Sequence, residues 1–99
     1  MISEHTQHIA VLTFCLHLPS AQSLKDKRMV LKSLKDKIRA QFNVSVCEMD
    51  GQDKWQVATF DVAMIGNDRR HMDACLNNIL SLVESYRAVE LTEQRIEYL

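Results

Sequence analysis

The chain has 99 residues, 46% of them hydrophobic and 25% charged, which is the balance of one soluble globular domain. Its two glycines and single proline exclude low-complexity tracts, and no run approaches the ~18 apolar residues of a membrane-spanning helix. The polar start of the chain and an odd count of three cysteines predict free thiols in a reducing cytoplasm.

The net charge of −1 excludes a globally basic nucleic-acid binder, but the charge is unevenly distributed. Residues 21–42 contain seven basic and two acidic side chains, a net charge of +5, so the rest of the chain carries −6. We therefore expect a local basic surface on a molecule that is nearly neutral overall.

The first predicted element is a strand over residues 8–18, and residues 1–7 are expected to form a flexible N-terminal segment. The strand alternates between a strongly apolar face and a mixed face, which is the period of a half-buried strand. The apolar face carries Ala10, Leu12, Phe14, Leu16 and Leu18. Pro19 then ends the strand.

A helix is predicted next, from the N-cap Ser23, with Asp26 three residues on, to about Gln41. Its apolar side chains are Leu24, Leu31, Leu34, Ile38 and Phe42. Beside them, within roughly 80° of arc, lies a stripe that we call the basic ridge: Lys25, Arg28, Lys32, Lys35 and Arg39. Lys27 falls in the apolar arc, where it either extends outward at the helix start or pairs with an acid.

The second half of the chain predicts two strands, a helix and a last strand. They lie near 43–50, at 54–65, at roughly 68–86 and near 89–98, with a turn at Asp50-Gly51-Gln52-Asp53. In the strand at 54–65, even-numbered residues face inward, whereas Trp55, Val57 and Thr59 face outward. The last strand is irregular, because Leu91 and Ile96 fall on opposite parities.

The order βαββαβ predicts an α+β, ferredoxin-like fold for a single domain over residues 8–99. Its four-stranded antiparallel sheet would have the first and third strands at the centre and both helices on one face. The opposite face would carry Cys15, His17, Trp55 and Thr59. This fold hosts many activities and does not by itself give a function.

Four segments are similar to those of one known family. They are Ser23-Leu24-Lys25-Asp26-Lys27-Arg28, Phe42-Asn43-Val44-Ser45-Val46, Asp50-Gly51-Gln52-Asp53-Lys54-Trp55-Gln56, and Asn67-Asp68 with His71. In order and spacing, over roughly residues 9–98, the chain resembles the YlxP-like family of small bacterial proteins of unknown function. The resemblance implies a ferredoxin-like fold and no established activity. Members are often encoded beside ribosome-maturation and translation-initiation genes, which implies RNA. Gly51 departs from the many relatives that have a histidine there, so no metal or acid–base role is carried over.

The first functional hypothesis is a non-catalytic binding module for an anionic partner, such as ribosomal or structured RNA. Lysines and arginines that neutralise phosphates release counterions and add salt-sensitive affinity. The candidate residues are Lys25, Lys27, Arg28, Lys32, Lys35 and Arg39. The alternative for the same residues is a solvated helix face that keeps the protein soluble.

The second hypothesis is a protein-interaction or homodimerisation module. Trp55, Val57 and Thr59 would then form the interaction surface on the open sheet face, with the tryptophan against another chain. Trp55 is alternatively a platform for stacking a base. The sheet lacks the RNP1-like run of a standard RNA-recognition motif.

Metal binding has less support, and no cofactor is expected. Cys15 and His17 share a strand face, but Cys47 would lie about two strand spacings, ~10 Å, from the first strand, too far for a shared zinc ion.

Catalysis also has less support. The loop after the first strand lacks the glycines and arginine that acyl-phosphate hydrolysis needs. Cys75, on the apolar face of the second helix, is expected to act as a small hydrophobe. Asp50, Asp53 and His71 would form an acid–base cluster if the fold gathered them, while turn capping explains the two aspartates.

Overall fold

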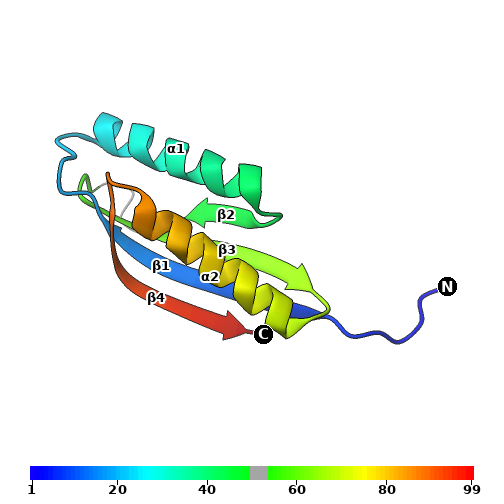
Figure 1. Ribbon diagram of the computed structural model, residues 1–99. Coiled ribbons are helices and arrows are strands. Elements are labelled where there is room, and N and C mark those ends of the chain that lie inside the picture. Colours follow the sequence, from blue (N-terminus) through cyan, green and yellow to red (C-terminus); the bar gives the residue numbers. More distant parts are fainter. Residues whose placement is uncertain (50–53) are drawn as a thin grey trace.

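The computed structural model describes residues 1–49 and 54–99, and it confirms the predicted βαββαβ order (Figure 1). The elements are β1 (His8–His17), α1 (Leu24–Gln41), β2 (Ser45–Glu48), β3 (Val57–Gly66), α2 (Arg69–Ser85) and β4 (Glu90–Tyr98). The strands form one antiparallel sheet in the order β2-β3-β1-β4, with β1 and β3 in the centre as predicted. The predicted turn over residues 50–53 lies outside the described residues.

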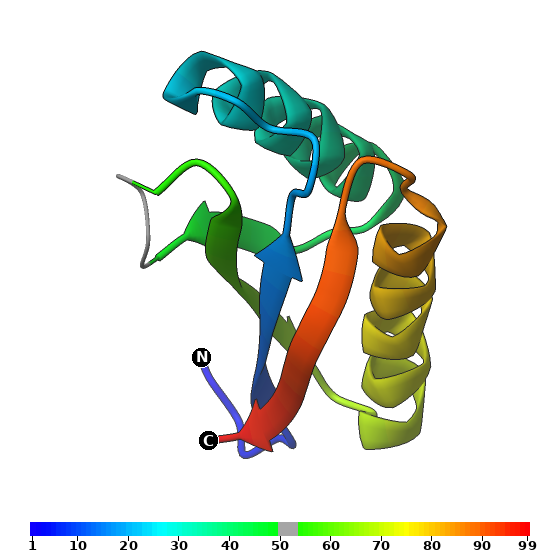
Figure 2. The same cartoon turned by 90° about the vertical axis from the view of Figure 1, so that its left-hand side faces the viewer.

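Both helices lie on the same face of the sheet, as Figures 1 and 2 show. The even-numbered residues of β1 from Ala10 to Leu16 face them and are buried, whereas the odd-numbered residues from Val11 to His17 remain half-exposed. The rings of Phe14 and Phe60, 5.5 Å apart, join β1 to β3 in the core. Leu34 and Ile38 of α1 and Leu76 and Ile79 of α2, among others, complete this core. The alternation that predicted the strand therefore decides which sheet face the helices cover.

Side chains cap both helix starts, and at α1 they are the predicted Ser23 and Asp26. The Ser23 hydroxyl accepts a hydrogen bond from the Asp26 N–H at 3.1 Å, and the Asp26 carboxylate accepts one from the Gln22 N–H at 3.0 Å. At α2, the Asp68 carboxylate accepts from the Arg70 and His71 N–H groups. These side chains satisfy N–H groups that a helix start leaves without intrahelical partners.

The strand β3 begins at Val57, three residues later than predicted. Its pairing with β1 ends at His17 opposite Val57, because β1 itself ends before Pro19. The Gln56 carbonyl accepts from the Leu18 N–H at 2.8 Å, and the Gln56 side chain donates to the Ala21 carbonyl at 3.2 Å. Trp55 consequently lies in a bend before β3 and not within the strand.

The change of parity in β4 is a β-bulge at Thr92. Leu16 pairs with Leu91, whereas Cys15 pairs with Glu93, so Thr92 is an extra residue. Its hydroxyl donates to the Cys15 carbonyl at 3.1 Å. One extra residue inverts the alternation, and Leu91 and Ile96 therefore both face the core.

Candidate functional site

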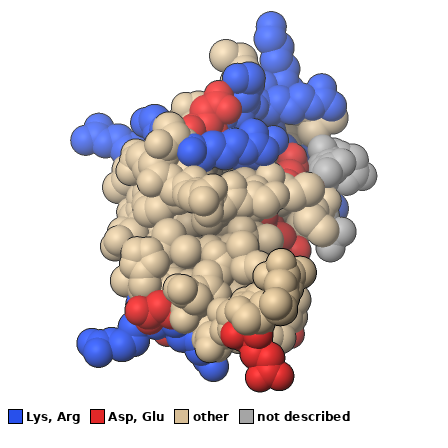
Figure 3. Space-filling view, turned by 90° about the vertical axis from the view of Figure 1, so that its right-hand side faces the viewer, with Lys and Arg blue, Asp and Glu red and all other residues tan. Residues whose placement is uncertain are grey.

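The basic ridge runs along the outer side of α1. Lys25, Arg28, Lys32 and Arg39 are exposed, and Lys35 is half-buried. Figure 3 shows Lys and Arg side chains gathered along the top of the molecule, over α1, above a face that is largely uncharged. The five predicted ridge residues thus share one surface, as their spacing requires.

Lys27 is not part of this surface. It is 1% exposed, and its Nζ lies 3.1 Å from Glu48 Oε2, which comes from β2. Of the two outcomes predicted for Lys27, pairing with an acid is confirmed. Its position in the apolar arc of α1 turns it toward β2, so it is unavailable as an exposed contact for an anion.

Three ridge cations border a hollow of about 400 Å³ between α1 and β2. Arg28, Lys35 and Arg39 come from the helix, and Val46, Cys47 and Glu48 form the opposite wall. The Arg39 Nη2 donates to the Val46 carbonyl at 3.1 Å, which holds this guanidinium along the edge of the sheet. Cations around a concave surface favour a phosphate, because each can donate hydrogen bonds to its oxygens.

Lys32 differs from those three, because it forms an ion pair on its own helix. Its Nζ lies 2.9 Å from Asp36 Oδ2, with both side chains well exposed. The hydrogen bond from Lys32 lowers the pKa of Asp36, so this carboxylate is ionised at neutral pH and offsets part of the ridge charge. The net positive charge of the ridge is therefore carried mainly by Lys25, Arg28, Lys35 and Arg39, and the last three border the hollow.

Trp55 and Val57 lie together at one end of the open sheet face. They are 52% and 41% exposed and border the same shallow hollow of about 420 Å³. Thr59 lies further along β3, half-buried, with its hydroxyl 3.6 Å from the Cys15 sulfur. The three predicted interaction residues thus follow one edge of the face, and two of them are exposed apolar side chains.

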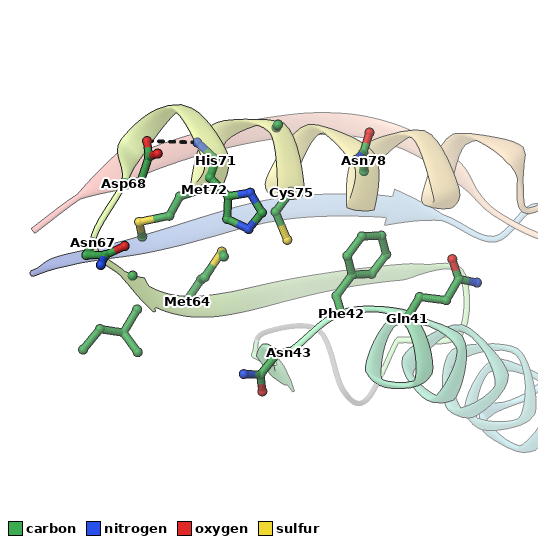
Figure 4. A pocket seen from close by; sticks show the side chains of 13 residues that line it. Gln41, Phe42, Asn43, Met64, Asn67, Asp68, His71, Met72, Cys75 and Asn78 are labelled. Carbon is green, nitrogen blue, oxygen red and sulfur yellow. Dashed lines mark hydrogen bonds between the residues drawn. The ribbon is translucent and has the colours of Figure 1, made fainter.

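A larger cavity, of about 560 Å³, lies between the C-terminal end of α1 and the N-terminal half of α2. We call it the interhelix cavity. It is lined by Gln41, Phe42, Asn43, Met64, Ile65, Gly66, Asn67, Asp68, His71, Met72, Ala74, Cys75 and Asn78. Figure 4 shows the rings of Phe42 and His71 and the sulfur of Cys75 turned toward the same space.

The sequence did not indicate this cavity, because its residues come from separate turns. The fold joins them: β2 begins opposite Ala63 and β3 ends at Gly66, so the loops after α1 and after β3 share one edge of the sheet. Two of the segments that carry the family resemblance, at Phe42-Asn43 and at Asn67 to His71, meet here. That convergence is the signal that would have found the cavity.

The cavity has no group activated for nucleophilic attack among the described residues. Burial raises the pKa of the Cys75 thiol, so it is the neutral thiol and not the reactive thiolate at neutral pH. His71 lines the cavity, while its suggested partners Asp50 and Asp53 lie outside the described residues.

The side chains that could bind a metal ion are likewise dispersed in the described part of the chain. Cys15 and His17 lie on β1 and Cys47 lies on β2, with β3 between the two strands. Within residues 1–49 and 54–99, no three His, Cys, Asp or Glu side chains gather as a metal would require. In the same residues no helix is long and apolar enough to cross a membrane.

The fold and the ridge define a ferredoxin-like α+β domain with a basic surface on its first helix. Residues 9–96 match the model of a family described as "Protein of unknown function (DUF503)", and the chain belongs to that family. It is also 36% identical over 78 residues to the uncharacterized protein YlxP of Bacillus subtilis (strain 168), covering 79% of this chain and 85% of that protein. The predicted family is therefore confirmed.

A solved structure with a TM-score above 0.5 supports the fold and nothing further. The de novo designed protein Foldit4 superposes with a TM-score of 0.54 at 16% sequence identity, over 91% of this chain and 96% of that one. SnoaB, a cofactor-independent oxygenase from Streptomyces nogalater, reaches a TM-score of 0.47 at 13% identity, over 95% of this chain and 91% of that one.

Proposed function

We propose that this chain is a non-catalytic binding module that holds an anionic partner, ribosomal or structured RNA, on the basic ridge of α1. The observation that carries the proposal is the convergence of Arg28, Lys35 and Arg39 on one hollow beside β2. A helix face that serves solubility needs no such convergence, whereas a phosphate backbone is bound by several cations at once.

The test compares two charge reversals on the same helix, Lys35→Glu and Lys37→Glu. Lys35 borders the hollow, while the Lys37 Nζ lies 4.9 Å from the Tyr86 ring, on the side of α1 that faces α2. Affinity for structured RNA is measured by fluorescence anisotropy at several salt concentrations. We expect Lys35→Glu to weaken binding and to reduce the salt dependence by about one unit of slope, as for a lost phosphate contact. Equal RNA affinities for wild type and Lys35→Glu at every salt concentration would refute the proposal.

A second candidate function is homodimerisation or protein binding through the open sheet face. It rests on Trp55 and Val57, two exposed apolar side chains that border one shallow hollow. Light scattering of wild type and Trp55→Ala tests it directly. A larger mass for wild type at high concentration, lost in Trp55→Ala, would favour this function, and a monomer in both cases would end it.

A further inference from the structure

We infer that the interhelix cavity takes one unpaired nucleobase of an RNA strand whose phosphates lie on the basic ridge. This inference deepens the proposed function and rests on it for the phosphate contacts. The base contacts stand on a separate set of residues, so the two parts can fail independently.

The walls of the cavity suit a flat, apolar ring. Met72 is fully buried, while Phe42, Met64 and Cys75 are half-buried and present aromatic, thioether and thiol surface to the interior. Figure 4 shows the Phe42 ring on the α1 side and the His71 ring on the α2 side of this space. Unpaired bases in single-stranded RNA are bound in this way, by stacking on aromatic side chains.

The rim of the cavity suits the edge of a base. It carries His71 and the exposed amides of Gln41, Asn43, Asn67 and Asn78. A primary amide offers both donors and an acceptor, and base edges present the same two kinds of group. The rim therefore matches an uncharged ligand that needs both hydrogen-bond donors and hydrogen-bond acceptors from the protein.

The charges around the cavity argue against a phosphate inside it. Its described lining contains no lysine or arginine, and the carboxylate of Asp68 already accepts hydrogen bonds from the N–H groups of Arg70 and His71. An anion would meet this carboxylate without a compensating cation. The cavity thus selects the uncharged part of a nucleotide.

The phosphates of the same strand have a place on the other side of α1, in the hollow between this helix and β2. Gln41 lines the cavity and Arg39 the basic hollow. The two residues are ~3 Å apart along the axis of α1 but about 200° apart around it, so a strand that joins the two sites passes around the C-terminal end of this helix. A volume of about 560 Å³ also lies within the range of ligand pockets that enclose small molecules.

The experiment compares a single-stranded RNA with an abasic ribose-phosphate oligomer of equal length. The cavity variants are Asn43→Ala and His71→Ala, both at exposed positions where substitution leaves the fold intact. The matched control is Asn77→Ala, an exposed amide of α2 that donates to the Asp73 carbonyl and lies outside the cavity. Adenosine and uridine, which have no phosphate, are titrated separately and followed by nuclear magnetic resonance.

We expect wild type to bind RNA about tenfold more tightly than the abasic oligomer, the gain typical of one stacked base. His71→Ala, which removes a ring, should lose most of that factor, and Asn43→Ala, which removes a rim amide, should lose part of it. Both should keep the same affinity for the abasic oligomer and the same salt slope, and Asn77→Ala should match wild type. The nucleosides should shift the resonances of His71 and of the cavity amides.

If wild type bound RNA and the abasic oligomer equally well, and nucleosides caused no resonance shifts, this inference would be overturned and the ridge proposal would stand. Nucleoside binding in the cavity without any binding of the abasic oligomer would support this inference and refute the ridge proposal.

Discussion

Lys27 is the one charged side chain that is buried among residues 1–49 and 54–99, and it stabilises the contact between α1 and β2. We expect Lys27→Ala to lower the free energy of unfolding by about 2–4 kcal/mol. The change removes a packed aliphatic stem and takes a cation from Glu48, whose side chain is 19% exposed, so the full cost of a completely buried pair is not reached. Urea denaturation measures the effect.

The control for this prediction is Lys25→Ala, the same substitution two positions earlier on α1. Lys25 is exposed, so its loss should change the stability by no more than about 0.5 kcal/mol. Helix propensity favours alanine slightly at both positions and cancels from the comparison. If the two variants unfolded at the same urea concentration, the buried ion pair would contribute nothing to stability.

At the scale of single residues, the sequence predicted that Lys27 lies in the apolar arc of the helix, but it did not identify the acid that pairs with its ammonium group. Helical spacing alone placed it among Leu24, Leu31 and Leu34. Its partner Glu48 is 21 positions away, and only the packing of α1 on β2 makes them neighbours. The remaining ridge residues needed no long-range information, because an exposed helix face is fixed by its own period.

At the scale of secondary-structure elements, the bulge in β4 predicts that two single-residue deletions destabilise the protein to different extents. Deleting Thr92 should cost about 1 kcal/mol, the hydrogen bond to the Cys15 carbonyl, because Leu91 and Ile96 stay on the core face. Deleting Gln94 keeps the bulge and shifts the register beyond it, so Ile96 and Tyr98 would turn to the open face. We expect this second deletion to cost at least about 2–3 kcal/mol of apolar burial.

Thermal and urea denaturation of the two deletion variants check this prediction. If deleting Thr92 destabilised the protein as much as deleting Gln94, the bulge itself, and not the register after it, would stabilise β4.

The same bulge explains why β4 was the least regular strand in the sequence. A period of two cannot describe a strand in which one extra residue inverts the alternation, whereas β1 and β3 have no such residue and were predicted by their alternation.

At the scale of the whole molecule, the topology gathered residues that no local pattern connects. Phe42 and Asn43 follow one helix and Asn67 to His71 begin the other, and the shared edge of the sheet brings them to the interhelix cavity. The sequence predicted the order of the elements and the sheet topology, because β1, β3 and both helices carry their own periods. It did not predict the cavity, because the lining residues come from different elements that only the packing of the helices on the sheet brings together.

The charge distribution also acts at this scale and distinguishes the two surfaces that RNA would meet. The open sheet face, which carries the odd-numbered residues of β1, is negatively charged along β4. There Glu90, Glu93 and Glu97 pair with His17, Cys15 and Val11 of β1. An RNA strand would be repelled from that face, although Trp55 lies at its end, and attracted to the basic ridge on the opposite side of the sheet. Base stacking is therefore expected at the interhelix cavity and not at Trp55.

The salt dependence of binding follows from this separation. With contacts from Lys25, Arg28, Lys35 and Arg39, affinity for RNA should fall by about a hundredfold between about 50 and about 200 mM monovalent salt. Association through the apolar side chains of Trp55 and Val57 would instead be insensitive to salt. Anisotropy titrations with RNA, combined with light scattering at the same salt concentrations, separate the two. A flat RNA titration beside a salt-resistant dimer that Trp55→Ala dissolves would reject the ridge and favour the open sheet face.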